Sequence, residues 1–99
     1  MAFSFPKSAR LSRDQAEAIG VEALGFLASE PQRLAAFLGA SGLDLAEVRA
    51  RAGDPDLLAG VLDHLVRDES LLLVFAAEAS HPPERVVMAG HVLAGDIAP

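Results

Sequence analysis

The feature that most constrains this chain is its excess of helix-forming over strand-forming residues. Alanine and leucine supply 19 and 15 of the 99 residues, whereas there are eight valines, two isoleucines, and no threonine, tyrosine or tryptophan. Strands favour β-branched and aromatic side chains, while alanine and leucine have high helix propensities. A chain shorter than about 150 residues also favours one domain. The sequence therefore predicts a single all-α domain, a compact irregular bundle of five to six short helices.

Helix-start signals recur along the chain. Three segments fit the capping box, in which a side-chain oxygen accepts from a first-turn N–H and a later Glu or Gln reaches back: Ser12–Gln15, Ser29–Gln32 and Asp44–Glu47. Asp54 before Pro55 is a further N-cap, and Gly42 stands where a left-handed helix end is favoured. Together with apolar residues at helical spacing, these signals predict helices at about 12–28, 30–41, 44–52, 55–67, 70–79 and 83–94.

The same spacing predicts which side chains face the core. On four of the helices the apolar residues recur one turn apart, and we expect these residues to be buried: Ala16, Ile19, Ala23, Phe26, Leu27; Leu34, Phe37, Leu38; Leu58, Val61, Leu62, Leu65; Val86, Val87, Ala89, Leu93. The small residues Ala16, Gly20 and Ala23 also offer a surface on which a neighbouring helix could approach closely.

Charge is unevenly distributed. Residues 1–13 hold Lys7, Arg10 and Arg13 and no acid, a charge of +3, whereas residues 14–99 hold 5 basic and 14 acidic residues, a charge of −9. We therefore expect a flexible basic arm at 1–11, a helical domain at 12–94 and a frayed tail at 95–99. The overall charge of −6 disfavours nucleic acid as the main partner, because phosphate binding relies on Lys and Arg.

Hydropathy and cysteine content indicate the compartment. The N-terminal residues lack the apolar core of a secretory signal, and the longest apolar run, Leu71–Ala77, is far shorter than the ~20 residues that a membrane-spanning helix needs. The chain has no cysteine, which excludes disulfides, thiolate nucleophiles and cysteine-ligated zinc. We expect a cytoplasmic protein that does not associate with a membrane.

The spacing of several leucine-rich segments resembles a known family. The resemblance covers about residues 22–90 and lies in the FLA at 26–28, the FL and glycine within 37–42, and the Asp-Glu-Ser-Leu at 68–71. The chain resembles a bacterial, mainly alphaproteobacterial, family of helical proteins of about 100 residues catalogued as a domain of unknown function. The resemblance implies a small all-helical protein and brings no established activity or functional residues.

Histidine and acid spacing gives one candidate polar site. His64 and Asp68 stand four residues apart, so one turn of helix would let both face the same point, with Glu69 adjacent. Two such side chains are half of a metal site, and His81, Glu84 or His91 would have to complete it. The alternative is that Asp68 caps the next helix. No nucleophile elbow or phosphate-binding loop is present, so we assign no catalytic, cofactor or metal residues and expect no enzyme.

A second candidate is nucleic-acid binding through residues 34–53, which resemble a helix-turn-helix. Arg49 and Arg51 lie on its second helix, but the charges of Asp44 and Glu47 cancel those of the two arginines. The two acids also lie at the start of this helix, the end that would contact the bases. This reading ranks third among the functions considered.

The apolar segment at 70–79 gives the leading functional hypothesis. Leu71, Leu72 and Leu73 cannot all face one direction on a helix, and Val66 continues the same surface. Either the whole segment is buried in the monomer, or one side contacts a partner. We expect an interaction or adaptor module, or a homo-oligomer such as a homodimer, with these four residues at the contact. An enzyme or metal-binding accessory using His64 and Asp68 is the alternative.

Overall fold

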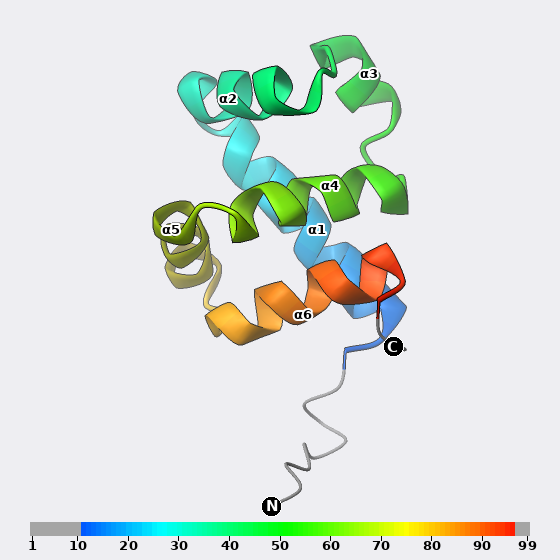
Figure 1. Cartoon of the computed structure of the whole chain (residues 1–99), viewed down its shortest axis with the longest axis vertical. Helices are drawn as coiled ribbons and strands as arrows, with labels where there is room; N and C mark the ends of the chain where they lie inside the picture. The colour runs from blue at the N-terminus through cyan, green and yellow to red at the C-terminus, as the bar shows by residue number, and fades with distance from the viewer. Residues whose placement is uncertain (1–10, 97–99) are drawn as a thin grey trace, which may run out of the picture.

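The structure is a computed structural model that describes residues 11–96, and these residues form α-helices without any strand. The helices are α1 (Arg13–Ala28), α2 (Pro31–Ser41), α3 (Leu45–Ala50), α4 (Pro55–Val66), α5 (Glu69–Ala79) and α6 (Pro83–Ala94) (Figure 1). The all-α prediction is confirmed, and each helix begins and ends within two residues of its predicted bounds. Residues 1–10 and 97–99, which hold most of the predicted arm and tail, lie outside the described residues.

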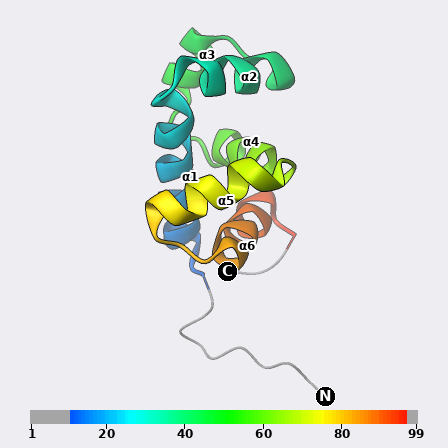
Figure 2. The same ribbon diagram turned by 90° about the vertical axis from the view of Figure 1, so that its left-hand side faces the viewer.

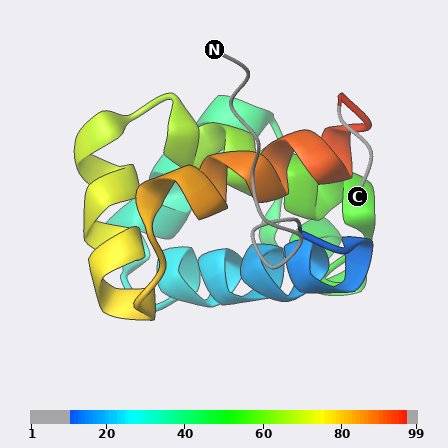
Figure 3. The ribbon, with the colours of Figure 1, turned by 90° about the horizontal axis from the view of Figure 1, so that it is seen from below.

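Three helices form the centre of the bundle. α4 and α6 run side by side across α1, which forms a separate layer behind them in Figure 1 and along the lower edge in Figure 3. α5 closes one side of this unit, and α2 with α3 lies at the end farthest from the start of α1 (Figure 2). Among residues 11–96, no helix lies over the outer faces of α4 and α6, which are turned away from α1 (Figures 1 and 3).

The core follows the predicted apolar spacing in α1 and α4. All five residues predicted on α1 are buried, as are all four on α4, where Leu57 joins them. The close-approach surface on α1 receives α4, because a Cβ on Gly20 would lie 2.9 Å from the Cβ of Leu58. Glycine at this position thus lets α1 and α4 pack more closely than any larger residue would permit.

α2 and α6 bury fewer of their predicted residues. In α2 only Phe37 is buried, and Leu34 and Leu38 are partly exposed because α2 lies at the edge of the bundle, with α1 and α4 covering one side. In α6, Val86, Ala89 and Leu93 are buried together with Val92, whereas Val87 is partly exposed. Leu34, Leu38 and Val87, which we expected on the core side of their helices, are therefore only partly buried.

The helix caps agree with the sequence in all but one case. Ser12 and Gln15 form the predicted capping box, as do Asp44 and Glu47, and Gly42 ends α2 with φ of 75°. Ser29 does not start α2: its hydroxyl donates to the carbonyl of Phe26 at 2.7 Å, so it belongs to the end of α1. The N-cap of α2 is Glu30, whose side chain makes no capping hydrogen bond.

The core begins one residue before the predicted domain boundary. Leu11, which the sequence analysis assigned to the arm, is only 1% exposed and belongs to the core cluster. Its apolar side chain lies directly before the N-cap of α1, so burial of Leu11 fixes the point at which the chain enters the bundle.

Candidate functional site

The four residues predicted at a partner contact divide between the core and the surface. Leu72 is 8% exposed and packs in the core, so it is not available to a partner. Leu73 and Val66 are 48% and 37% exposed, and Leu71 is partly buried. Val74, which was not predicted, is 41% exposed beside Leu73. α5 is thus buried on the Leu72 side and carries an exposed apolar surface on the other.

His64 and Asp68 do not face a common point. α4 ends at Val66, and Asp68 is the N-cap of α5, its Oδ1 accepting from the N–H of Leu71 at 3.2 Å. His64 instead packs its ring edge-on against Phe37, with 5.4 Å between ring centres. Glu69 is exposed in the first turn of α5. The structure therefore favours the capping alternative for Asp68, and no hydrogen bond within residues 11–96 joins it to His64.

The other candidate ligands are similarly dispersed. His81 pairs with Glu22 of α1 at 3.1 Å, and His91 pairs with Asp96 at the same distance. Across the described part of the chain, no three His, Asp or Glu side chains lie where they could together hold a metal ion. His81 and His91 thus tie chain segments to each other rather than converging on His64.

A hollow of about 420 Å³ lies between α2 and α4. We call it the α2–α4 hollow; it is lined by Phe37, Ala40, Ser41, Leu43, Arg51, Asp56, Leu57, Gly60, Asp63, His64 and Arg67. Its lining mixes apolar side chains with polar ones, among them two arginines and two aspartates. Because these charges balance, the hollow has no strong preference for an anion over a cation.

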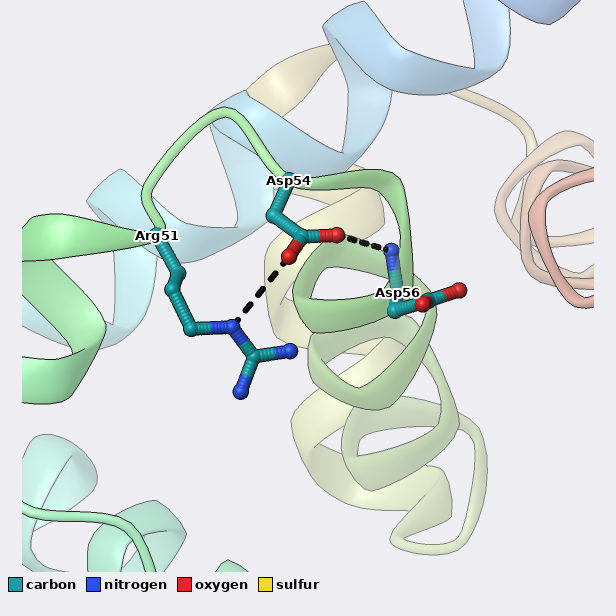
Figure 4. A network of polar contacts seen from close by, with 3 residues as sticks. All are labelled: Arg51, Asp54 and Asp56. Atoms are coloured by element: carbon teal, nitrogen blue, oxygen red, sulfur yellow. Dashed lines mark hydrogen bonds and ion pairs between the residues drawn. The ribbon is translucent and has the colours of Figure 1, made fainter.

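Arg51 in this lining is held by the start of α4. Its Nε donates to Asp54 Oδ2 at 3.2 Å, while Asp54 Oδ1 accepts from the backbone N–H of Asp56 at 2.8 Å (Figure 4). The N–H of Asp56 and the Arg51 guanidinium together hold the pKa of Asp54 below its ordinary value of 3.8. Because Arg51 follows a six-residue helix and is bound to Asp54, it forms part of the α3–α4 connection rather than of a DNA-reading helix.

A second hollow lies between the outer faces of α4 and α6 and has a volume of about 290 Å³. We call it the α4–α6 groove; it is lined by Ala59, Gly60, Asp63, Val66, Val87, Gly90, His91 and Ala94. Four of these residues are glycine or alanine, and two are valines, so most of the lining is apolar. Val66, predicted at a partner contact, forms part of its wall.

Two glycines shape the groove in different ways. A Cβ on Gly90 would lie 3.5 Å from the Cβ of Leu62, an ordinary contact, so Gly90 faces α4 at close range. A Cβ on Gly60 would meet no atom within 4 Å, so Gly60 opens onto empty space. Gly60 and Asp63 also border the α2–α4 hollow, and the two hollows therefore flank the same exposed side of α4.

Two exposed carboxylates lie at or beside the groove, and each is paired. The Asp63 side chain is well exposed and pairs with Arg67 at 2.8 Å, an i,i+4 pair on the surface of α4. Asp96, just beyond α6, carries a second exposed carboxylate beside His91. The groove thus combines an apolar floor with carboxylates at its edge.

The sequence analysis did not identify this groove. Its α6 residues Gly90 and Ala94 are small and one turn apart, and Ala59 and Gly60 are small neighbours on α4. Small residues in matching faces of two helices are the signal that could have indicated it. That signal has meaning only when the two helices are known to be adjacent, which the sequence does not establish.

These features define a small all-α protein in which one helix, α4, separates two surface hollows. In the part of the chain that the structure describes, no helix has both the length and the apolar character needed to cross a membrane. Comparison with protein-family models finds a match over residues 13–96 to a family described as "Protein of unknown function (DUF3572)", and the chain therefore belongs to this family. Searches of curated proteins and of solved structures find no match.

Proposed function

We propose that this protein is a non-enzymatic interaction module whose α4–α6 groove binds apolar side chains of a partner protein. The observation that carries the proposal is the groove itself, an apolar surface hollow of about 290 Å³ floored by small residues and walled by Val66 and Val87. Interfaces draw most of their affinity from a few anchor side chains in such pockets. The charged rim would fix the orientation of the partner.

The size of the effect follows from burial. Moving one leucine- or phenylalanine-sized side chain from water into the groove contributes roughly 1.5–3 kcal/mol. Two such anchors would contribute enough to offset much of the entropy lost on association, estimated at about 4–15 kcal/mol. The exposed α5 residues Leu73 and Val74 could add contact area next to the groove. We therefore expect at least two apolar anchors on the partner.

Gly60 provides a direct test because a side chain there would fill the groove without a clash. Gly60→Leu should block binding, and its matched control is Gly25→Leu on α1, where a Cβ also meets no atom within 4 Å. Both changes replace an exposed helical glycine by a better helix former, so both proteins should remain folded. Any difference in binding then reports the groove and not stability.

The partner can be found and checked in one experiment. A photo-crosslinking residue is placed in the full chain at Ala94 in the groove or, as a control, at Gly25, and crosslinked proteins are identified after irradiation in the native cell. We expect a protein that crosslinks at Ala94 and not at Gly25, and whose purified form binds Gly25→Leu but not Gly60→Leu. Crosslinks that are equal at both positions, no specific crosslink at all, or full binding to Gly60→Leu would each contradict the proposal.

Self-association through the same groove is tested separately. Sedimentation of the purified chain gives its mass in solution, which for a monomer is 10.3 kDa. A dimer that Gly60→Leu converts to a monomer would identify the partner as a second copy. A dimer unaffected by Gly60→Leu would show that the groove is not the interface.

A further inference from the structure

The start of the folded chain lies at the same end of the molecule as one end of the α4–α6 groove. Leu11 is buried and so fixes where residues 1–10 leave the body. The beginning of α1 and the end of α6 lie at the same end of the bundle in both Figure 1 and Figure 3. Ala94, the last residue of α6, lines the groove at that end. Residues 1–10 therefore join the body at the Ala94 end of the groove, but in the α1 layer, so they would have to pass around α6 to enter it.

The ten residues are long enough to follow the groove. A chain of ten residues spans at most roughly 33 Å when extended. The α6 side of the groove runs from Val87 to Ala94, which is about 10 Å at a helical rise of 1.5 Å per residue. Passing around α6, which is about 10–12 Å across, leaves roughly 20 Å of this reach, enough for the segment to lie along the groove.

The chemistry of this segment complements that of the groove. Phe3 and Phe5 are separated by one residue, a spacing that places both side chains on the same side of an extended chain. Lys7 and Arg10 give residues 1–10 a charge of +2, whereas residues 11–99 hold 6 basic and 14 acidic residues, a charge of −8. The groove offers small apolar residues for two aromatic rings. Asp63 is already paired with Arg67, so the carboxylate available for the cations is that of Asp96, which lies beside His91 at the end of the groove.

We propose that residues 1–10 of this chain dock in cis along the α4–α6 groove, with Phe3 and Phe5 as anchors. The aromatic rings cover Gly60 and Gly90, and Lys7 and Arg10 lie near Asp96. Docked in this way, the segment occupies the surface that a partner protein would need, so that it acts as an internal competitor. The docking itself goes beyond the proposed function and holds whether or not a partner exists.

The absence of cysteine makes the test specific, because Ser4→Cys creates a single attachment point for a nitroxide spin label in the full chain. Amide signals of the ¹⁵N-labelled protein are compared with the nitroxide oxidised and reduced. We expect strong broadening at Gly60, Gly90 and Ala94 and none at Gly25 or Gly39, two exposed glycines on α1 and α2. No broadening in the groove, or equal broadening at Gly25, would overturn the proposal.

Three controls separate this docking from its alternatives. The added change Gly60→Leu should remove the broadening while Gly25→Leu retains it, and Phe3→Ser with Phe5→Ser should also remove it. The spectrum itself reports whether each variant is folded. Broadening that survives loss of both phenylalanines would refute them as anchors. In a further control, ¹⁵N chains without a nitroxide are mixed with ¹⁴N chains that carry it. Broadening of the ¹⁵N signals in this mixture would show that a second copy, and not the same chain, supplies the segment.

Discussion

Replacing Gly20 by alanine tests the packing of α1 on α4. The added methyl group would lie 2.9 Å from the Cβ of Leu58, closer than Cβ atoms ordinarily approach. Leu58 is fully buried, and its Cβ is attached directly to the α4 backbone, so it cannot turn aside as the end of a long side chain would. α4 as a whole must shift away from α1, and the shift disturbs the other buried contacts between these helices.

The expected magnitude comes from two opposing effects. Overpacking a well-packed core destabilises by about 1–3 kcal/mol. Alanine in place of glycine in a helix contributes about 0.8–1.0 kcal/mol in the opposite direction. Gly25→Ala provides the matched control, because it lies on the same helix, is exposed, and would place its Cβ in open space. The difference between the two variants isolates the packing effect, about 1–3 kcal/mol.

Urea unfolding followed by far-ultraviolet circular dichroism measures this difference, since the chain has no tryptophan or tyrosine to report by fluorescence. Gly25→Ala should be more stable than the wild type, and Gly20→Ala less stable than Gly25→Ala by the amount above. In thermal unfolding of a domain of this size, each kcal/mol corresponds to roughly 4–8 °C. If Gly20→Ala is as stable as Gly25→Ala, the close contact between Gly20 and Leu58 does not exist and the reasoning is refuted.

Three further changes test the helix ends. The pKa of Asp54 is lowered in the folded chain, so the stability that this carboxylate contributes is present above pH 3.8 and is lost as the pH falls through the lowered pKa. Asp54→Asn cannot titrate and should therefore lose less stability than the wild type over that acid range. Urea midpoints measure this, and an identical loss in both proteins would contradict it. Asp68→Ala removes the N-cap of α5 and should destabilise by about 1 kcal/mol in urea unfolding, whereas the exposed Glu69→Ala should change stability by less than about 0.5 kcal/mol. Ser80 ends α5 in the left-handed conformation with φ of 59°, which glycine adopts without the steric cost of a Cβ. Ser80→Gly should therefore raise the thermal midpoint by the equivalent of about 0.5–1 kcal/mol. A lower midpoint would show that the serine hydroxyl contributes more to stability than the backbone conformation costs.

The positions of the helices were predictable because the signals that start and end them are local. The Ser12 and Asp44 capping boxes join residues three apart, and the left-handed conformation at Gly42 depends on that residue alone. Such interactions involve residues within one turn of helix, so a short stretch of sequence is enough to predict them. The exception, Ser29, shows the limit of the pattern: a serine between two helices can bond backward to Phe26 as readily as forward.

The exposure of individual leucines was less predictable because it depends on which helices become neighbours. Leu72 and Leu73 are adjacent and chemically identical, yet one packs in the core and the other is exposed. A helix that is apolar on all sides gives no periodic signal to separate them. The partner-contact prediction at 66 and 71–73 stays a prediction, and the structure removes only Leu72 from it by burying that residue in the core.

Three helical glycines look alike in the sequence and act differently in the fold. Gly20 is required by the close approach of Leu58, Gly90 faces Leu62 at ordinary contact distance, and Gly60 faces open space. A glycine in the middle of a helix destabilises by roughly 0.5–1 kcal/mol relative to alanine, so each one calls for a compensating reason. Packing supplies that reason for Gly20. For Gly60 no packing reason exists within the described residues, and the space it leaves in the groove is the one feature that an alanine or larger residue would remove. Gly25 and Gly39 are equally open and lie outside the groove, so the space at Gly60 alone does not show what fills it. The comparison of Gly60→Leu with Gly25→Leu decides whether residues 1–10 or a partner protein use that space.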